Sequence, residues 1–172
     1  MTSNNDYSMS YGKQKIKFDI SQDKNVRKIE TNSISVIEDF EAKIIEELRS
    51  PKGTDPLEEI VSQEDNIAIV VSDITRLSYR TYDFLPVLIK ELNRIGVKDS
   101  NVDIVIATGT HRPSTEEERV KILGADLNDR LDVHDHDSNS DNLVDLGETD
   151  RGTEIKVNPI VHEADKVILT GG

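Results

Sequence analysis

Two short polar segments, residues 72–76 and 107–115, carry the side chains best suited to chemistry. In chain order they hold Asp73, Thr75, Arg76, Thr108, Gly109, His111 and Arg112. An imidazole transfers a proton well near neutral pH, and a guanidinium binds a carboxylate or a phosphate through two parallel hydrogen bonds. If the two segments meet in space, they predict a site that binds a small anion and moves a proton.

Each of these segments follows a strand-like run of residues. Residues 66–71 and 102–107 are mostly apolar and β-branched, which is typical of strands covered on both faces. Thirty residues lie between Val71 and Val102, the length of a right-handed βαβ crossover, so we expect these strands to be parallel and adjacent. Both segments would then open at the carboxyl edge of one sheet, where open α/β sheets bind ligands.

The stretches that follow the two segments predict helices that hold them in place. The first stretch has apolar residues at helical spacing and a glycine stop, namely Tyr82, Leu85, Leu88, Ile89, Leu92, Ile95 and Gly96. The second begins at Ser114, which has the spacing of a capping box with Glu117, and acidic residues 116–118 complement the positive end of a helix dipole. His111 is therefore expected between two rigid elements.

The rest of the chain predicts the scaffold. We expect a disordered tail over residues 1–10, a half-buried edge strand over 15–20, helices over 35–49, 55–63 and 159–164, and strands over 154–157 and 166–170. The fold class is α/β, a mostly parallel, Rossmann-like sheet with helices on both faces, formed by one domain over residues 11–172.

Composition excludes several classes of protein. The formal charge is −13, with 21 Lys plus Arg against 34 Asp plus Glu, and this does not provide the basic surface that nucleic acid requires. The absence of cysteine excludes disulfides and thiolate metal sites within these residues. No apolar stretch is long enough to cross a membrane, and residues 1–10 are too polar for a signal peptide, so we expect a cytoplasmic location.

The paired motifs Asp73-Ile-Thr-Arg76 and Ala107-Thr-Gly-Thr-His-Arg112 resemble the amino-terminal domain of the lactate racemase family, enzymes that use a nickel-pincer nucleotide. The resemblance covers nearly the whole chain and implies the amino-terminal half of a two-domain enzyme that racemises or epimerises a lactate-like 2-hydroxy acid by reversible hydride transfer. It implies that His111 is the proton acceptor and donor and that Arg76 binds the substrate carboxylate. Asp73, Thr75, Thr108, Gly109 and Arg112 would then line the site or border the cofactor.

The same resemblance implies functional groups that the chain does not contain. The family has a second catalytic histidine, a lysine joined to the cofactor and a histidine that ligates nickel, and all three would lie beyond Gly172 together with the carboxyl-terminal domain. The resemblance therefore implies no metal ligand in this chain and a partner surface for its own carboxyl-terminal domain. We expect residues 1–172 alone to be inactive as a racemase.

Two alternatives stay open. The first is a non-catalytic α/β module that binds a carboxylate or a nucleotide at the same sheet edge. The second concerns residues 134–137, His-Asp-His-Asp, whose composition could suit a divalent metal ion. In an extended strand the two histidines and the two aspartates face opposite sides, so a solvated turn is favoured over a metal site. His162 is interpreted as a surface or packing residue, and neither the substrate's identity nor the oligomeric state follows from the sequence.

Overall fold

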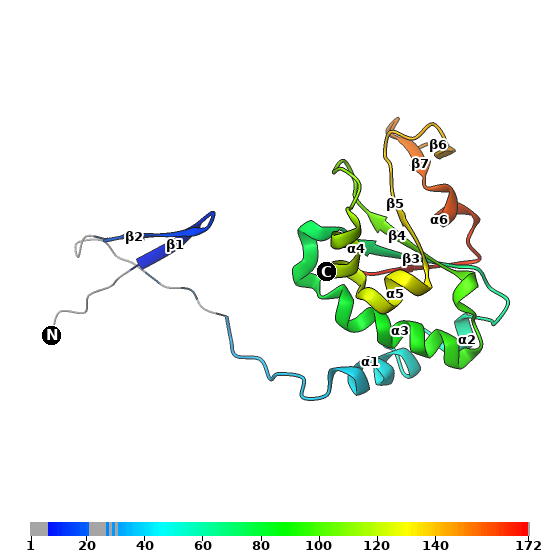
Figure 1. Ribbon diagram of the computed structural model, residues 1–172, viewed down its shortest axis with the longest axis horizontal. Coiled ribbons are helices and arrows are strands. Elements are labelled where there is room, and N and C mark those ends of the chain that lie inside the picture. Colours follow the sequence, from blue (N-terminus) through cyan, green and yellow to red (C-terminus); the bar gives the residue numbers. More distant parts are fainter. Residues whose placement is uncertain (1–6, 21–26, 28, 30, 172) are drawn as a thin grey trace. The chain divides into compact units, whose positions relative to one another are not determined.

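The computed structural model describes residues 7–20, 27, 29 and 31–171 (Figure 1). The chain divides into two compact units, Met1–Val36 and Ile37–Gly172. The first unit contains an antiparallel hairpin of strands β1 (Tyr7–Tyr11) and β2 (Gln14–Phe18). The second contains the parallel sheet and both polar segments, and it is the unit that concerns function.

The hairpin differs from what the sequence predicts for the amino-terminal residues. Tyr7 pairs with Phe18 and Met9 with Ile16, so apolar side chains share one face, and the rings of Tyr7 and Phe18 stack with centroids 5.9 Å apart. Residues 7–10 thus form a strand instead of a disordered tail, because the alternation Tyr7, Met9, Tyr11 matches that of β2; residues 1–6 lie outside the described residues. β2 pairs with β1 instead of extending the parallel sheet, and its side chains are exposed.

A four-stranded parallel sheet forms the centre of the second unit. Its strands are β5 (Asp132–Asp135), β4 (Val102–Ala107), β3 (Ile67–Ser72) and β8 (Lys166–Leu169), in that spatial order. β3 and β4 are adjacent and parallel, with Ile67 opposite Val102 and Ser72 opposite Ala107, as the crossover length predicts. Their carboxyl ends therefore lie side by side, and the two polar segments leave the sheet at the same edge.

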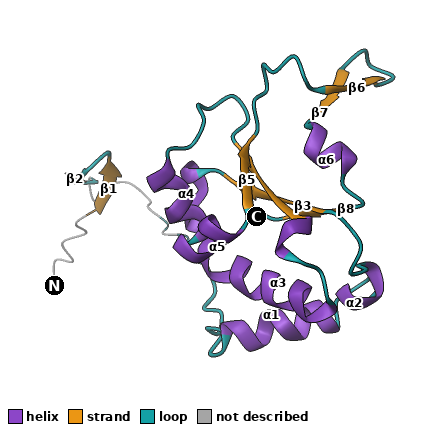
Figure 2. Cartoon of the chain, turned by 45° about the vertical axis from the view of Figure 1, so that its right-hand side comes forward, coloured by secondary structure: helices purple, strands orange, loops and turns teal. Residues whose placement is uncertain are grey.

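One face of this sheet carries the hydrophobic core. Helices α3 (Thr81–Ile95), α4 (Glu116–Leu123) and α5 (Ala125–Arg130) contribute apolar residues to this core, and α1 (Phe40–Arg49) packs against α3 (Figure 2). Ile69, Ile104, Leu85 and Leu92 are all completely buried there. Burial of each such side chain contributes about 1.5–3 kcal/mol, so this face fixes β3 and β4 firmly relative to α3 and α4.

Helix α6 (Pro159–Glu163) contacts β4 from the other side of the sheet, so helices flank the sheet as the fold class requires. The strands β6 (Val144–Glu148) and β7 (Glu154–Val157) form a separate antiparallel pair between β5 and α6. The remaining helical segments of this unit are α2 (Leu57–Ile60) and the 3₁₀ segments η1 (Ile74–Tyr79) and η2 (Asp99–Asn101).

Two predicted helix starts are wrong by a small number of residues. α1 begins at Phe40, where the Asp39 side chain accepts a hydrogen bond from the Ala42 amide, and not near residue 35. α4 begins at Glu116, and its capping box is formed by Thr115 and Glu118 instead of Ser114 and Glu117. The pattern in the sequence permits both registers, and the Ser114 amide is engaged by Asp135 instead.

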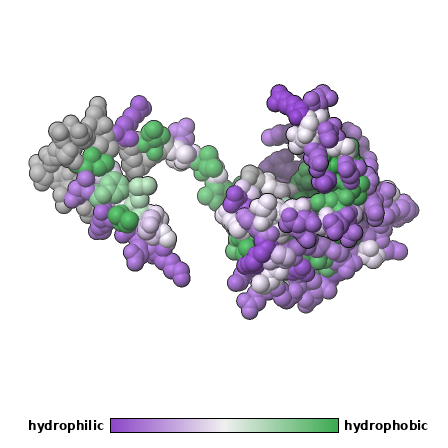
Figure 3. Space-filling model, turned by 90° about the horizontal axis from the view of Figure 1, so that it is seen from above, coloured by the Kyte–Doolittle hydropathy of each residue, from purple (hydrophilic) through white to green (hydrophobic). Residues whose placement is uncertain are grey.

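The surface agrees with the acidic composition. Hydrophilic side chains cover most of the 37–171 unit on the face shown in Figure 3, with smaller apolar areas between them. Among the residues that the structure describes, no helix combines the length and the apolar character needed to span a bilayer.

Candidate functional site

The two polar segments meet at a cavity of about 320 Å³ at the carboxyl edge of the sheet. The cavity is lined by Ser72, Asp73, Thr75, Arg76, Ala107, Thr108, Gly109, Thr110 and His111. Six of the seven residues singled out from the sequence therefore share one cavity, and the expectation that the two loops converge is confirmed.

At the centre of this cavity, Asp73 contacts His111. The carboxylate oxygen Oδ2 of Asp73 lies 2.6 Å from Nδ1 of the His111 ring, although 38 residues separate the two in sequence. The Asp73 side chain is 8% exposed and the His111 side chain is 55% exposed. A buried acid thus holds one nitrogen of a ring whose remaining surface faces the cavity and solvent.

Asp73 is itself held firmly in place. It caps η1, where Oδ1 accepts hydrogen bonds from the Thr75 amide at 3.2 Å and from the Thr75 hydroxyl at 2.5 Å. Burial raises the pKa of the Asp73 carboxyl, but the hydrogen bonds from Thr75 and His111 outweigh it and hold the pKa below its ordinary value. Asp73 therefore stays ionised near neutral pH and orients the imidazole.

This contact determines which nitrogen of His111 can act on a ligand. With Asp73 accepting at Nδ1, a neutral imidazole carries its proton on that nitrogen and presents an unprotonated Nε2. Such a ring can accept a proton at Nε2, and the neighbouring carboxylate stabilises the imidazolium that results. The Asp73–His111 pair has the arrangement of a general base with its orienting acid.

The loop that carries His111 turns sharply just after β4. The His111 amide donates to the Thr108 carbonyl at 3.0 Å, and Gly109 adopts a positive φ of 59° inside this turn. A Cβ atom at Gly109 would meet nothing within 4 Å, so the requirement for glycine comes from the backbone conformation and not from crowding. The Thr108 side chain is buried and donates to the carbonyl of His136, which fixes the start of the loop.

The two guanidiniums near the pair differ in their partners. Arg76 is exposed, and its guanidinium makes no hydrogen bond or ion pair with the residues that the structure describes, although its backbone amide donates to the Asp73 carbonyl at 2.9 Å. Arg112 binds Glu118 through two hydrogen bonds of 2.8 Å, and this pairing lowers the pKa of Glu118 from 4.5 to about 2. Arg112 was expected to help attract the anion, but its charge is already neutralised by Glu118.

Arg112 lines a second cavity, which shares Asp73, Thr75 and His111 with the first. This cavity measures about 270 Å³ and is lined by Asp73, Ile74, Thr75, His111, Arg112, Ser114 and Glu118. Asp73 and Glu118 place two carboxylates in its lining, so it suits an anion less well than the cavity that Arg76 lines.

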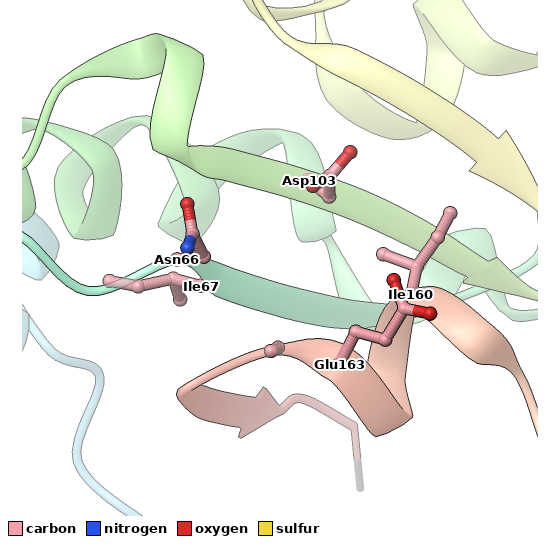
Figure 4. Close-up of a pocket in the computed structure, with 6 residues that line it drawn as sticks. Asn66, Ile67, Asp103, Ile160 and Glu163 are labelled. Atoms are coloured by element: carbon pink, nitrogen blue, oxygen red, sulfur yellow. The ribbon is translucent and has the colours of Figure 1, made fainter.

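A further hollow of about 250 Å³ lies at the amino ends of the strands, away from both loops. Figure 4 shows Asp103 and Glu163 there, together with Asn66, Ile67 and Ile160. Two carboxylates and no guanidinium line this hollow, which is unfavourable for a carboxylate or phosphate ligand. Of these three cavities, the one that Arg76 lines is therefore the best candidate for an anion site.

Residues 134–137 do not gather as metal ligands. His134 pairs with Asp103, with Nε2 2.9 Å from Oδ1, whereas the Asp135 carboxylate faces Arg119. Within the described ranges, no three His, Cys, Asp or Glu side chains lie close enough to hold a metal ion. The solvated turn favoured for this run is nevertheless wrong in part, since residues 132–135 form β5 at the edge of the sheet.

Comparison with known proteins identifies the family. A family model described as the lactate racemase N-terminal domain matches residues 11–172. The chain belongs to this family. The resemblance seen in the two sequence motifs is thereby confirmed.

Two lactate racemases are similar to this chain in sequence. That of Thermoanaerobacterium thermosaccharolyticum is 33% identical over 165 residues, which cover 94% of this chain and 38% of that protein. That of Lactiplantibacillus plantarum is 35% identical over 125 residues, which cover 72% of this chain and 29% of that protein. The chain thus spans well under half the length of these racemases.

A solved structure of a lactate racemase also matches this chain. The lactate racemase apoprotein from Thermoanaerobacterium thermosaccharolyticum matches with a TM-score of 0.76 and 31% sequence identity, over 95% of this chain and 38% of that one. The α/β fold predicted from the sequence is therefore the fold of the lactate racemase N-terminal domain.

Proposed function

We propose that the protein carrying this chain interconverts the two configurations of a lactate-like 2-hydroxy acid, and that the Arg76 cavity is its substrate site. The observation that carries this proposal is the Asp73–His111 pair, which faces a cavity lined by an unpaired guanidinium. Membership of the lactate racemase N-terminal domain family supports the class of reaction. The cytoplasmic location expected from the composition remains a prediction.

In this proposal Arg76 binds the substrate carboxylate. A planar guanidinium with no other partner can donate two parallel hydrogen bonds to a carboxylate, which sets both the position and the rotation of the acid. Thr75 and Thr108–Thr110 lie on the same cavity wall and limit where the substrate's carbon atom can lie. The formal charge of −13 on this chain gives the Arg76 guanidinium added importance, because it must attract an anion against that charge.

His111 handles the hydroxyl proton. Oxidation of a 2-hydroxy acid removes the hydroxyl proton and the hydrogen on the carbon with its electron pair, and leaves a 2-keto acid. His111 accepts the hydroxyl proton at Nε2 and returns it when the keto acid is reduced on the opposite face. Asp73 holds the ring at Nδ1 throughout and stabilises its protonated form.

The proposed cofactor is a nickel-pincer nucleotide, which when bound supplies the acceptor for the carbon's hydrogen and its electron pair that no side chain can provide. The cavity has room beside His111 for part of such a group, and Thr108–Thr110 would border it. The family resemblance implies that the nickel-ligating histidine lies outside these residues, so in this proposal they contact the cofactor without ligating its metal.

The test is racemisation by the natural protein that contains this chain, loaded with cofactor and offered single enantiomers from a panel of 2-hydroxy acids. We expect loss of optical activity with a lactate-like acid, and its abolition by His111→Ala. The exposed His162 provides the matched control, and His162→Ala should leave the rate unchanged. A protein that binds the acid through Arg76 without racemising it would instead be the non-catalytic module, and the proposed reaction would be wrong.

A further inference from the structure

The run of residues 134–137 has a role in the structure other than metal binding. Asp135 ends β5 directly beside β4, where it is paired in register with Ile106. Its side chain is only 7% exposed, which is unusual for an aspartate and requires that its charge be compensated. The contacts that compensate this charge lead to the His111 loop.

The Asp135 carboxylate binds two groups. Oδ2 accepts from Nη2 of Arg119 at 2.5 Å, and Oδ1 accepts from the backbone amide of Ser114 at 3.1 Å. Arg119 also donates from Nη1 to the carbonyl of Val133 at 3.4 Å, so α4 is tied to β5 at two points. Ser114 lies three residues after His111 and immediately before the cap of α4. Asp135 therefore holds the end of the loop that carries His111.

His136, the residue that follows β5, holds the start of the same loop. The buried Thr108 hydroxyl donates to the His136 carbonyl, and the His136 amide donates to the Ile106 carbonyl at 2.9 Å. Two consecutive positions at the end of β5 thus tie both ends of the loop to the sheet. Between these ties the loop residues 109–113 are exposed, and the Arg112–Glu118 pair links them to α4 and not to the sheet.

We propose that Asp135, held by Arg119, is a positioning residue for His111. This inference rests on the proposed function, in which His111 must keep its Nδ1 against Asp73 and its Nε2 toward the substrate. Asp73 is on the β3 side and His111 on the β4 side, so their 2.6 Å contact depends on the backbone position of the His111 loop. A displacement of about 1 Å at a reacting group lowers a rate by as much as about 10²-fold.

The first test measures the loop without any enzyme assay. ¹⁵N-histidine NMR of the 172-residue chain reports the His111 ring nitrogens, with the signals assigned by His111→Ala. We expect Asp135→Ala to shift and broaden these signals, because the ring loses its fixed contact with Asp73. The matched control is Asp99→Asn, which removes a paired acid at the other end of β4, where Asp99 lies 2.9 Å from Arg130. This control should leave the His111 signals unchanged.

The second test is kinetic and uses the natural protein. Asp135→Ala should lower kcat about tenfold and leave KM within about twofold, because Arg76 lies on the other loop and keeps its position. Asp135→Asn keeps an acceptor for the Ser114 amide and should lose less. Arg119→Lys keeps the positive charge and should restore most of the activity that Arg119→Ala loses.

Unchanged His111 ring signals in a folded Asp135→Ala chain would overturn the proposal. If Asp135→Ala does not fold, Asp135→Asn decides instead, and wild-type ring signals with wild-type kcat in that variant would equally overturn it. Absence of racemisation in the wild-type protein would contradict the proposed function, whereas the NMR result would still decide whether Asp135 positions His111.

Discussion

The two loops at the carboxyl edge of the sheet carry one arginine each, and the two arginines differ in availability. The Arg76 guanidinium has no hydrogen-bond or ion-pair partner among the described residues, whereas the Arg112 guanidinium is bound to Glu118 by two hydrogen bonds. Glu118 also accepts from the Thr115 amide at 2.9 Å as part of the α4 capping box. One loop therefore offers a free cation to a ligand, and the other uses its cation to fasten itself to a helix.

This difference shows why residue type alone does not identify an anion site. From the sequence, Arg76 and Arg112 are equally good candidates for binding the anion, since each follows a buried strand and lies beside a threonine or a histidine. The deciding feature is Glu118, six residues further along, which the α4 helix brings back to Arg112. An arginine whose charge is already compensated must break an ion pair before it can bind a substrate.

The largest effect on kcat is expected at His111, which the second loop carries and which Asp73 of the first loop contacts. His111→Ala removes the proton acceptor and should lower kcat about 10³-fold, within the range that general acid–base catalysis contributes. The measurement is the rate at which one enantiomer of the substrate is converted into the other. A loss of less than about threefold would mean that another group carries the proton.

The next largest effect on kcat is expected at Asp73, on the first loop. Asp73→Asn keeps the size of the side chain but places an amide where His111 now contacts a carboxylate. Because the amide no longer selects the tautomer of the ring that has its proton on Nδ1, kcat should fall about 10²-fold. The Asp73 contacts with Thr75 would be weakened as well, so circular dichroism must first show that the fold is kept. Wild-type kcat in a folded variant would remove Asp73 from the mechanism.

The arginine comparison is tested by matched substitutions. Arg76→Lys should raise KM about tenfold, because a point charge cannot reproduce the two parallel hydrogen bonds of a guanidinium. Arg112→Lys should leave KM within about twofold, because Arg112 is bound to Glu118. Saturation kinetics on both variants give the answer, and the reverse order of effects would assign the carboxylate to the other loop.

The smallest effect is on stability in acid. The Glu118 pKa is about 2 in the folded chain against 4.5 as the ordinary value, so the unfolded state binds more protons between these values. Its stabilising contribution is complete above about pH 4.5 and is lost as the pH falls toward about 2. Glu118→Gln should reduce the difference in urea midpoint between pH 5 and pH 3, whereas equal pH dependence in both proteins would argue against the Arg112–Glu118 pair.

The framework of this site could be predicted from the sequence. The strands at residues 66–71 and 102–107 are mostly apolar and β-branched, and the crossover between them has the length of a βαβ unit, which favours a parallel, adjacent arrangement. That geometry alone places Arg76 and His111 at one edge. The family motifs gave the same residues independently.

The contacts within the site could not be predicted, because they join residues that are distant in sequence. The sequence placed Asp73 in the lining of the site without a partner, and the structure pairs it with His111, 38 residues away. β5 was missed because residues 132–135 are short, contain a single apolar residue and run directly into a stretch rich in Asp, Ser and Asn that is typical of a turn. The role of Asp135 in holding the Ser114 amide depends on that strand and was missed with it.

A crystal structure of the natural protein with a 2-hydroxy acid bound would show whether the acid lies between Arg76 and His111. We expect the carboxylate within hydrogen-bond distance of the Arg76 guanidinium and the hydroxyl oxygen within the same distance of His111 Nε2. A carboxylate bound to Arg112 with Glu118 displaced, or an acid that contacts neither Arg76 nor His111, would contradict it.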